Sequence, residues 1–194
     1  MTSPRKVRII FFEQSIGCET CAATRRALAQ LAESNDQVTL ETLNLVLDKE
    51  KAAEYGVDRV PAIIVSAPEC DRIRYYGAPL GHEWQTLIEA VTMMSAGSRP
   101  LSDQNRARLG TLSRAVRLQV FFTPTCVYCP RMISLANQLA VASPLVSAVA
   151  IDATEYPDLV HRYNVNGVPK TVINDTIEVM GAVSEDDLVA AVTG

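Results

Sequence analysis

Residues 121–130 read FFTPTCVYCP, and residues 11–21 read FFEQSIGCETC. Each stretch joins an apolar run that ends in two phenylalanines to a pair of cysteines separated by two residues. The first cysteines of the two pairs, Cys18 and Cys126, lie 108 positions apart. A Val-Pro dipeptide follows each of them at the same distance, with its proline 43 positions further on. A repeat of this length is too long for a solenoid unit and indicates a duplicated domain.

The same order of strands and helices is predicted in both copies. Apolar, β-branched runs indicate strands, and apolar residues spaced three or four apart indicate helices. In the first copy, strands are expected at 6–12, 37–44, 61–66 and 72–76, and helices at 19–33, 48–55 and 82–94. In the second copy, strands are expected at 116–122, 145–151, 169–174 and 176–181, and helices at 103–113, 127–141, 155–163 and 184–192. This order predicts an α/β fold in which each copy has a mixed central sheet flanked by helices.

The chain is predicted to divide into two domains. Residues 96–100 form a small, polar segment with glycine and proline, which is typical of a linker. The domains are therefore expected at 1–96 and 101–194. A domain of about 100 residues is long enough to bury a core of its own.

The composition disfavours nucleic acid and membrane partners. The chain has 194 residues, 48% of them hydrophobic, and a net charge of −4. Its positive charges are dispersed, whereas a nucleic-acid-binding protein usually has a basic face. No apolar run approaches the length of a membrane span, and the apolar stretch near the N-terminus is too short and interrupted for a secretion signal. A cytoplasmic location is expected as the default.

The two cysteine pairs, Cys18 with Cys21 and Cys126 with Cys129, are predicted to be redox centres. Each pair stands where a strand passes into a helix, so its first cysteine is expected at the helix N-terminus. Unpaired amide groups and the helix dipole favour a thiolate there, and the thiolate is the reactive form of cysteine. The second cysteine, about one turn further on, can attack the mixed disulfide that the first one forms. The first cysteine of each pair is therefore expected to be the nucleophile, and the second the resolving thiol.

Each Val-Pro dipeptide is predicted to help bind a substrate peptide. Proline cannot donate a hydrogen bond to a strand ladder, and a cis bond before it would turn the chain sharply. In a fold of this class, the turns at Val60-Pro61 and Val168-Pro169 would place backbone groups beside the sulfurs, where a disulfide-bonded peptide could pair as an added strand. Cis bonds at both prolines are therefore a hypothesis. Tyr128, between the cysteines of the second pair, is expected to contact the substrate.

The redox loop of the second copy resembles that of a known family. Pro124-Thr125 followed by residues 126–130, CVYCP, is similar to the loop of glutaredoxins and thioredoxins. Residues 167–174, GVPKTVIN, and 74–83, RYYGAPLGHE, resemble two-domain glutaredoxin-like protein disulfide oxidoreductases, and the resemblance covers the whole chain. It implies two fused thioredoxin folds, electron exchange with disulfide-containing protein substrates, and recharging by a thioredoxin reductase. It also implies that the groove beside the second pair is the main substrate site.

The two centres are not expected to be equivalent. Cys18 is followed by Glu19, whose negative charge disfavours a thiolate beside it. Cys126 is followed by Val127 and Tyr128, which carry no charge. The second pair is therefore predicted to be the more reactive one. The first pair is expected to be a reservoir, a relay or a weaker site.

Other functions are consistent with four paired cysteines. One is an electron shuttle dedicated to a peroxidase such as a peroxiredoxin. Another is a zinc-stabilised interaction module, although the 104 residues between Cys21 and Cys126 exceed the roughly 15–20 residues between the ligand pairs of compact zinc sites. A redox-inert scaffold is a third alternative, which the paired cysteines disfavour. Thiol–disulfide exchange itself requires no metal and no organic cofactor, because the electrons arrive from another protein.

Three further side chains allow alternative interpretations. Cys70 lies in an insertion of the first copy and is interpreted as an incidental thiol. Glu13 is interpreted as a surface acid, with a role as proton acceptor during exchange as the alternative. Lys170, beside the second proline, could support a thiolate or could be an ordinary solvated lysine.

Overall fold

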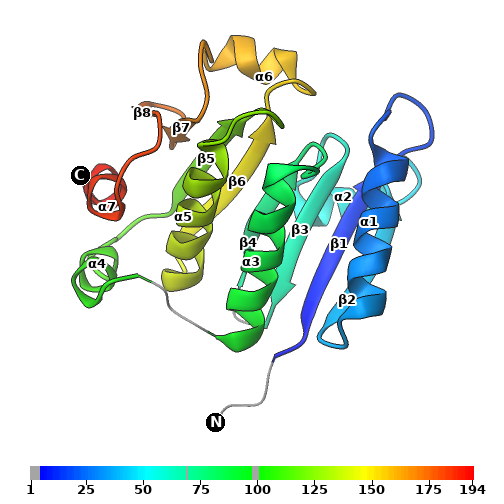
Figure 1. Ribbon diagram of the computed structural model, residues 1–194, viewed down its shortest axis with the longest axis horizontal. Coiled ribbons are helices and arrows are strands. Elements are labelled where there is room, and N and C mark those ends of the chain that lie inside the picture. Colours follow the sequence, from blue (N-terminus) through cyan, green and yellow to red (C-terminus); the bar gives the residue numbers. More distant parts are fainter. Residues whose placement is uncertain (1–4, 69, 98–100) are drawn as a thin grey trace.

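Both copies of the repeat fold with the element order that the sequence predicts (Figure 1). The computed structural model describes residues 5–68, 70–97 and 101–194. The first copy consists of β1 (Val7–Glu13), α1 (Cys21–Ser34), β2 (Val38–Asn44), α2 (Lys49–Tyr55), β3 (Ala62–Ala67), β4 (Cys70–Tyr76) and α3 (His82–Ala96). The second copy consists of α4 (Asp103–Leu109), β5 (Val116–Phe122), α5 (Cys129–Ala142), β6 (Val146–Asp152), α6 (Pro157–Arg162), β7 (Lys170–Ile173), β8 (Ile177–Met180) and α7 (Glu185–Thr193).

The strands of the two copies join edge to edge into one mixed sheet. Their order is β2-β1-β3-β4-β6-β5-β7-β8. Within each copy one pair is parallel, β1 with β2 or β5 with β6, and the other pairs are antiparallel. The join is a parallel pairing of β4 with β6, which runs from Ile73 opposite Ala148 to Tyr76 opposite Ile151. The α/β class with a mixed sheet is thus confirmed, while this pairing between the copies was not foreseen.

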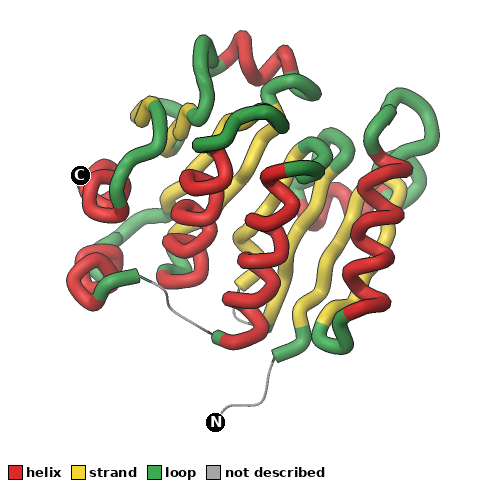
Figure 2. The backbone as a smooth tube through the Cα atoms, in the orientation of Figure 1, coloured by secondary structure: helices red, strands yellow, loops and turns green. Residues whose placement is uncertain are grey.

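Both faces of the sheet are buried beneath helices. Phe11 and Phe122 belong to the largest apolar cluster, to which α1, α3, α5 and α7 contribute. Phe12 and Phe121 lie in two smaller clusters that include residues of α2 and α6. Figure 2 shows α1, α3 and α5 side by side across one face of the sheet. Because side chains alternate between two buried faces, the strands read as continuous apolar runs in the sequence.

The boundary between the copies follows the predicted linker only in part. The last helix of the first copy, α3, ends at Ala96, and α4 begins at Asp103. Residues 98–100 of the predicted linker lie outside the described residues. The division into domains 1–96 and 101–194 therefore stays a prediction. Helix α4 ends at Leu109, earlier than the predicted 113.

Candidate active site

Each cysteine pair is closed as a disulfide immediately before a helix. Cys18 is bonded to Cys21 and Cys126 to Cys129, and the two Cα atoms of each pair are 5.5 Å apart. In both pairs the first cysteine is partly exposed and the second is buried. An incoming thiol or disulfide can therefore reach the first sulfur more readily than the second.

The two helices begin later than the sequence predicts. Helix α1 starts at Cys21 and α5 at Cys129, two residues later than predicted, so the first cysteine of each pair stands three residues before its helix. Thr20 and Tyr128, directly before the helices, already have right-handed helical backbone angles. Because each first cysteine is bonded to the first residue of its helix, its sulfur still lies at the helix N-terminus. The expected stabilisation of a thiolate by unpaired amide groups therefore applies to this arrangement.

The two Val-Pro bonds are cis, which confirms the hypothesis from the sequence. Val60-Pro61 leads into β3 and Val168-Pro169 leads into β7. The carbonyl of Pro61 accepts a hydrogen bond from the N–H of Gly77, which follows β4, at 3.0 Å. The carbonyl of Pro169 accepts one from the N–H of Gly181, which follows β8, at 2.8 Å. Val60 and Val168 both pack against the main core cluster, to which the cysteines also belong. Phe12 pairs with Ala62 and Phe121 with Lys170, so each turn lies at the end of the sheet where the redox loop of its copy begins.

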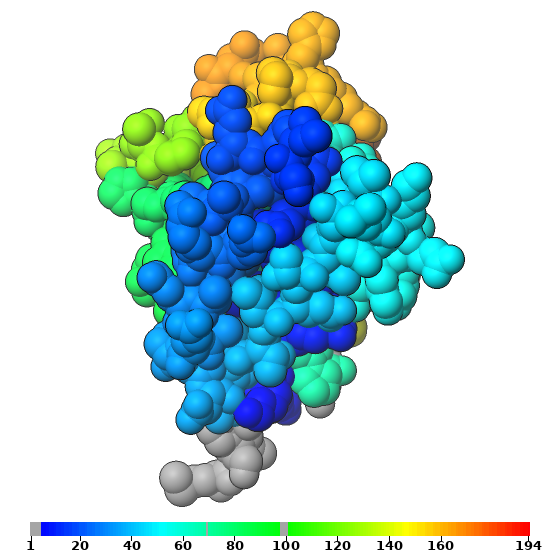
Figure 3. Space-filling view, turned by 90° about the vertical axis from the view of Figure 1, so that its right-hand side faces the viewer, coloured from blue at the N-terminus to red at the C-terminus, as the bar shows by residue number. Residues whose placement is uncertain are grey.

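Exposed apolar side chains border both disulfides. In the second redox loop, Val127 and Tyr128 are 67% and 68% exposed. In the first loop, Ile16 is 88% exposed, and the loop after β2 adds Val46 and Leu47, which are 54% and 83% exposed. Figure 3 shows the first redox loop, dark blue below the orange segment, at the molecular surface. Exposed apolar side chains that cluster in this way are typical of surfaces that bind other proteins.

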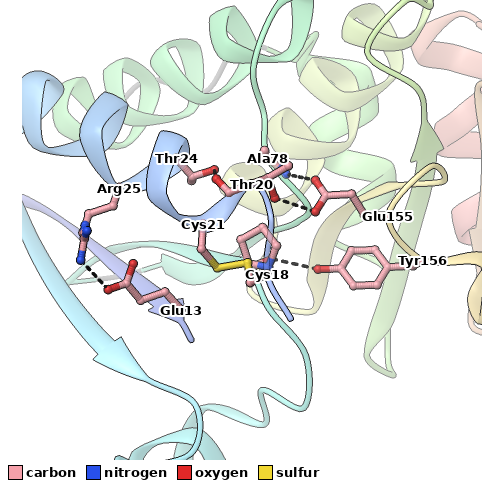
Figure 4. The surroundings of a disulfide bond; sticks show 10 residues. Glu13, Cys18, Thr20, Cys21, Thr24, Arg25, Ala78, Glu155 and Tyr156 are labelled. Carbon is pink, nitrogen blue, oxygen red and sulfur yellow. Dashed lines mark hydrogen bonds and ion pairs between the residues drawn. A yellow bond between two sulfur atoms is a disulfide. The ribbon is translucent and has the colours of Figure 1, made fainter. Parts of the chain in front are cut away.

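Glu155 and Tyr156, which the sequence analysis missed, reach the first redox centre from the second copy (Figure 4). The carboxylate of Glu155 accepts hydrogen bonds from the Thr20 hydroxyl and from the backbone N–H of Ala78, both at 2.7 Å. The Tyr156 hydroxyl donates a hydrogen bond to the Pro61 carbonyl at 3.1 Å. Glu155 and Thr20 are 135 positions apart in the chain, and no local motif marks either of them for this contact.

Glu83, also missed, is a buried acid at the start of α3. Among the described residues, neither of its carboxylate oxygens has a hydrogen-bond partner. Burial, together with the nearby charge of Asp152, raises the pKa of Glu83 from 4.5 to about 7. A Cβ added to Gly81 would lie 3.7 Å from the carbonyl oxygen of Pro124, so this end of α3 adjoins the second redox loop. A carboxyl group with such a pKa can take up or release a proton near neutral pH.

Lys170 has neither of the two roles considered from the sequence. Its side chain is buried, and its Nζ donates to the carbonyls of Tyr163 and Asn164 at 2.7 and 3.1 Å. It also forms an ion pair with Glu178 at 2.9 Å. Lys170 therefore connects the end of α6 to β7 and β8, and it is neither solvated nor available to a thiolate.

Cys70 and Glu13 are also more enclosed than the sequence suggested. Cys70 opens β4 instead of lying in a loop, and its buried thiol is 3.9 Å from the carbonyl of Ala140 in α5. Glu13 ends β1 and forms an ion pair with Arg25 of α1 at 3.0 Å, with only 17% of its side chain exposed. It lies in the surroundings of the first disulfide (Figure 4).

The four paired thiols do not form one cluster. They are divided between two disulfides in separate copies, whereas a zinc-stabilised module needs four ligands around one ion. The described part of the chain contains no group of three or more His, Cys, Asp or Glu side chains placed to hold a metal ion. No helix within residues 5–68, 70–97 and 101–194 is long and apolar enough to cross a membrane.

Known proteins have folds similar to that of this chain. A family model described as a thioredoxin domain matches residues 5–89 and 116–193. A protein disulfide oxidoreductase from Aeropyrum pernix has a crystal structure that matches with a TM-score of 0.89 and 29% identity, over 98% of this chain and 85% of that chain. The NTD_N/C domain of alkylhydroperoxide reductase AhpF from Enterococcus faecalis matches with a TM-score of 0.88 and 22% identity, over 98% of this chain and 92% of that one. At that identity, the second likeness shows the fold alone.

A curated relative links part of a longer protein to this chain. The AhpF component of alkyl hydroperoxide reductase in Escherichia coli is 24% identical over 174 residues, which are 88% of this chain but 31% of that protein. The chain spans about a third or less of the length of the curated relatives it matches first.

Proposed function

This chain belongs to the thioredoxin domain family and is a protein disulfide oxidoreductase, and we propose that it passes electrons from a reductase to a peroxidase by thiol–disulfide exchange. The observation that carries this proposal is the pairing, in both centres, of a partly exposed first sulfur with a buried second sulfur. The resemblance inferred from the redox loops, to two-domain glutaredoxin-like oxidoreductases, is confirmed by the same matches.

The second centre is proposed to carry out the main exchange. In the reduced protein, the Cys126 thiolate attacks a partner disulfide, forms a mixed disulfide and releases one partner sulfur, which takes up a proton. The Cys129 thiol then loses its proton and attacks the Cys126 sulfur, which closes the disulfide and releases the second partner sulfur as a thiolate that takes up a proton from solvent. Two electrons pass from the two cysteines to the partner. Glu83, with its pKa near 7, is proposed to accept the proton from Cys129.

The partner is proposed to bind along the second redox loop. Val168 and Pro169 would pair with an extended segment of the partner, and Tyr128 with Val127 would provide apolar contact. The same parts recur at the first centre as Val60 and Pro61, next to the Cys18–Cys21 pair. That pair is proposed to hold a second pair of electrons and to act as a relay.

The curated relatives support a peroxidase as the partner. The AhpF component of alkyl hydroperoxide reductase in Escherichia coli matches 88% of this chain, and proteins of that name occur repeatedly among the relatives. The name ties those proteins to peroxide reduction. This support favours the peroxidase shuttle over the general exchange on protein disulfides that the sequence analysis put first. The reductase is proposed to be of the thioredoxin reductase class, and the location is proposed to be cytoplasmic.

A second candidate function is exchange with protein disulfides in general. Two observations favour it: the likeness to the Aeropyrum pernix oxidoreductase over most of both chains, and the exposed apolar side chains beside each disulfide. Such a surface would accept many partner sequences.

The two candidates are separated by reconstitution. The purified chain is mixed with NADPH, a thioredoxin reductase, a peroxiredoxin and hydrogen peroxide, and NADPH oxidation is followed; insulin replaces the peroxidase system in a parallel assay. NADPH oxidation that requires both the chain and peroxide, and is lost in Cys126→Ser, supports the shuttle. Reduction of insulin without any effect on peroxide turnover replaces it with the second candidate. If both assays are negative and neither pair oxidises reversibly in graded redox buffers, the proposed function is wrong.

A further inference from the structure

One carboxylate of the second copy is hydrogen-bonded inside the first redox loop. Glu155 accepts a hydrogen bond from the hydroxyl of Thr20, which stands between Cys18 and Cys21 (Figure 4). Its other carboxylate oxygen accepts the backbone N–H of Ala78, in the loop after β4. Two donors at 2.7 Å hold this carboxylate in one position. Its charge is therefore fixed beside the first redox centre.

The backbone is shaped for this close contact between the copies. Gly77, which follows β4, has a φ of +96°, and a Cβ there would lie 2.5 Å from the Cβ of Asp152 and 3.2 Å from Glu155 Oε1. Only glycine allows this approach, because any side chain would collide with the end of β6. Tyr156 extends the contact to the carbonyl of Pro61.

Among the described residues, no carboxylate accepts a hydrogen bond from the second redox loop as Glu155 does from the first. The offset of 108 that relates the cysteines makes Leu47 the counterpart of Glu155, and Leu47 follows the edge strand β2, which faces no other copy. Leu47 is an exposed apolar side chain. Val127 and Tyr128 stand in the second loop where the first loop has Glu19 and Thr20, and both are largely exposed. A carboxylate held by a hydrogen bond from the redox loop therefore distinguishes the first centre, whereas the oxygens of Glu83, near the second loop, have no such partner among the described residues.

Several other charged and titratable groups surround the first disulfide. Taken element by element, they are Glu13 on β1, Arg25 on α1, Glu19 in the redox loop, Arg59 before the first proline, and Asp152, Glu155 and Tyr156 around the end of β6. The charge of Glu13 is matched by its ion pair with Arg25. Arg59 forms ion pairs with Asp58 and Asp158. Glu155 has neutral donors only, so its charge is not matched by a cation in these hydrogen bonds.

We propose that Glu155 is a positioning residue that makes the first centre the more strongly reducing of the two. A fixed anion disfavours the Cys18 thiolate, which makes the reduced form of this pair less stable relative to its disulfide. At equilibrium, the thiols of Cys18 and Cys21 are oxidised to their disulfide, while the disulfide of the second pair takes up the two electrons and two protons and becomes a dithiol. The second copy thereby sets the direction of electron flow toward its own centre. This inference rests on the proposed thiol–disulfide function.

The substitution Glu155→Gln in the full chain tests this role. The rate of Cys18 alkylation in the reduced protein is measured by peptide mapping from pH 5 to 9, and the oxidation state of both pairs is measured across graded redox buffers. Removal of the charge is expected to make Cys18 alkylation about threefold faster below pH 7. The midpoint of the first pair should move toward a less reducing value. The second pair, in the same molecule, is the internal control and should not change.

Two further variants separate charge from structure. Glu155→Asp keeps the charge and is expected to retain the wild-type pH profile of Cys18. Asp158→Asn removes an exposed carboxylate of the neighbouring helix that pairs with Arg59, and it should leave Cys18 unchanged. The inference is overturned if Glu155→Gln leaves the Cys18 profile and the first midpoint at their wild-type values, or if it shifts both pairs equally. If neither pair of the wild-type protein oxidises reversibly, it is the proposed function that fails.

Discussion

The first and second redox centres are built on the same backbone plan, but they have different neighbours. In each, a disulfide precedes a helix and stands beside a cis Val-Pro turn. The first centre is bordered by Glu155 and Tyr156 of the other copy, whereas Val127 and Tyr128 of the second centre are exposed. A duplicated site therefore acquires two chemical environments once its two copies share one sheet.

The strand order explains why only the first centre has this neighbour. Pairing of β4 with β6 brings the segment after β6 next to Gly77, at the end of β4. The strand β8 is the counterpart of β4 in the second copy, and it lies at the edge of the sheet. A Cβ added to Gly181, the glycine that follows β8, would meet nothing within 4 Å. Only the first centre thus adjoins the join between the two copies, and in this sense we call it the inner site and the second centre the outer site.

Replacement of each nucleophilic cysteine should have the largest effect on turnover, and the two losses should show which centre contributes more to catalysis. Cys126→Ser is expected to lower turnover with a protein disulfide by at least about a hundredfold, because it removes the attacking sulfur of the centre that is proposed to carry out the main exchange. Cys18→Ser is expected to cost less than about tenfold. Steady-state reduction of insulin measures both. A larger loss in Cys18→Ser would reverse the ranking.

A pair of glycine substitutions tests the contact that distinguishes the inner site. Gly77→Ala is expected to lower the free energy of unfolding by about 2–4 kcal/mol, because the new Cβ combines a positive φ with a collision against Asp152. Gly181→Ala is the matched control, with a φ of +76° and open space, and should cost about 1 kcal/mol. Urea unfolding gives both values. Equal losses of unfolding free energy in the two variants would show that the contact between the copies at Gly77 does not restrict the side chain there.

The buried acid next to the outer site should make stability depend on pH. The pKa of Glu83 is about 7 in the folded protein and 4.5 when exposed, so the folded protein binds the proton more tightly. The stability this provides is complete below about pH 4.5 and is lost as the pH rises through 7. Glu83→Gln is expected to flatten this decline and to be more stable than the wild type at pH 8 by about 2 kcal/mol.

Urea unfolding at pH 5 and pH 8 measures this difference. Burial also raises the pKa of Asp152, which stays in the variant and leaves a smaller decline of the same sign. An unchanged decline in Glu83→Gln would mean that Glu83 is not the group responsible.

The smallest expected effect concerns the exposed apolar side chains beside each disulfide. Tyr128→Ala should reduce kcat/KM for protein disulfides by about threefold, because it removes contact area without touching the core. The exposed residue of the inner site, Ile16, provides the comparison, and Ile16→Ala should have less effect. Thermal unfolding should be unchanged in both. A greater loss in Ile16→Ala would identify the inner site as the one that binds partners.

The parts of each site that could be predicted from the sequence are those with local signals. The cysteine spacing, the Val-Pro dipeptides and the apolar runs each report on a few neighbouring residues, and most elements begin and end within two residues of their predicted bounds. The exception is α4, which ends four residues early, while α1 and α5 beside the cysteines begin two residues late. There, a turn between the two cysteines replaces the expected first helical residues.

The residues that were missed or misread depend on partners far along the chain. Lys170 is charged, and only the carbonyls at the end of α6 explain its burial. Cys70 is buried because β4 is an inner strand of the joined sheet. Glu155 meets Thr20 only through the pairing of β4 with β6, and no pattern within either strand specifies that pairing.

The join between the copies connects unlike edges, since β6 is the counterpart of β2 and pairs with β4. Contacts of this kind are heterologous, and repeated between separate molecules they generate an open filament instead of a closed ring. The fused chain leaves one edge of each kind, β2 with seven residues and β8 with four. A short edge strand that carries a charge, here Glu178, resists further strand addition. Separate copies could repeat this edge-to-edge strand pairing indefinitely. In the fused chain the pairing occurs once, between β4 and β6.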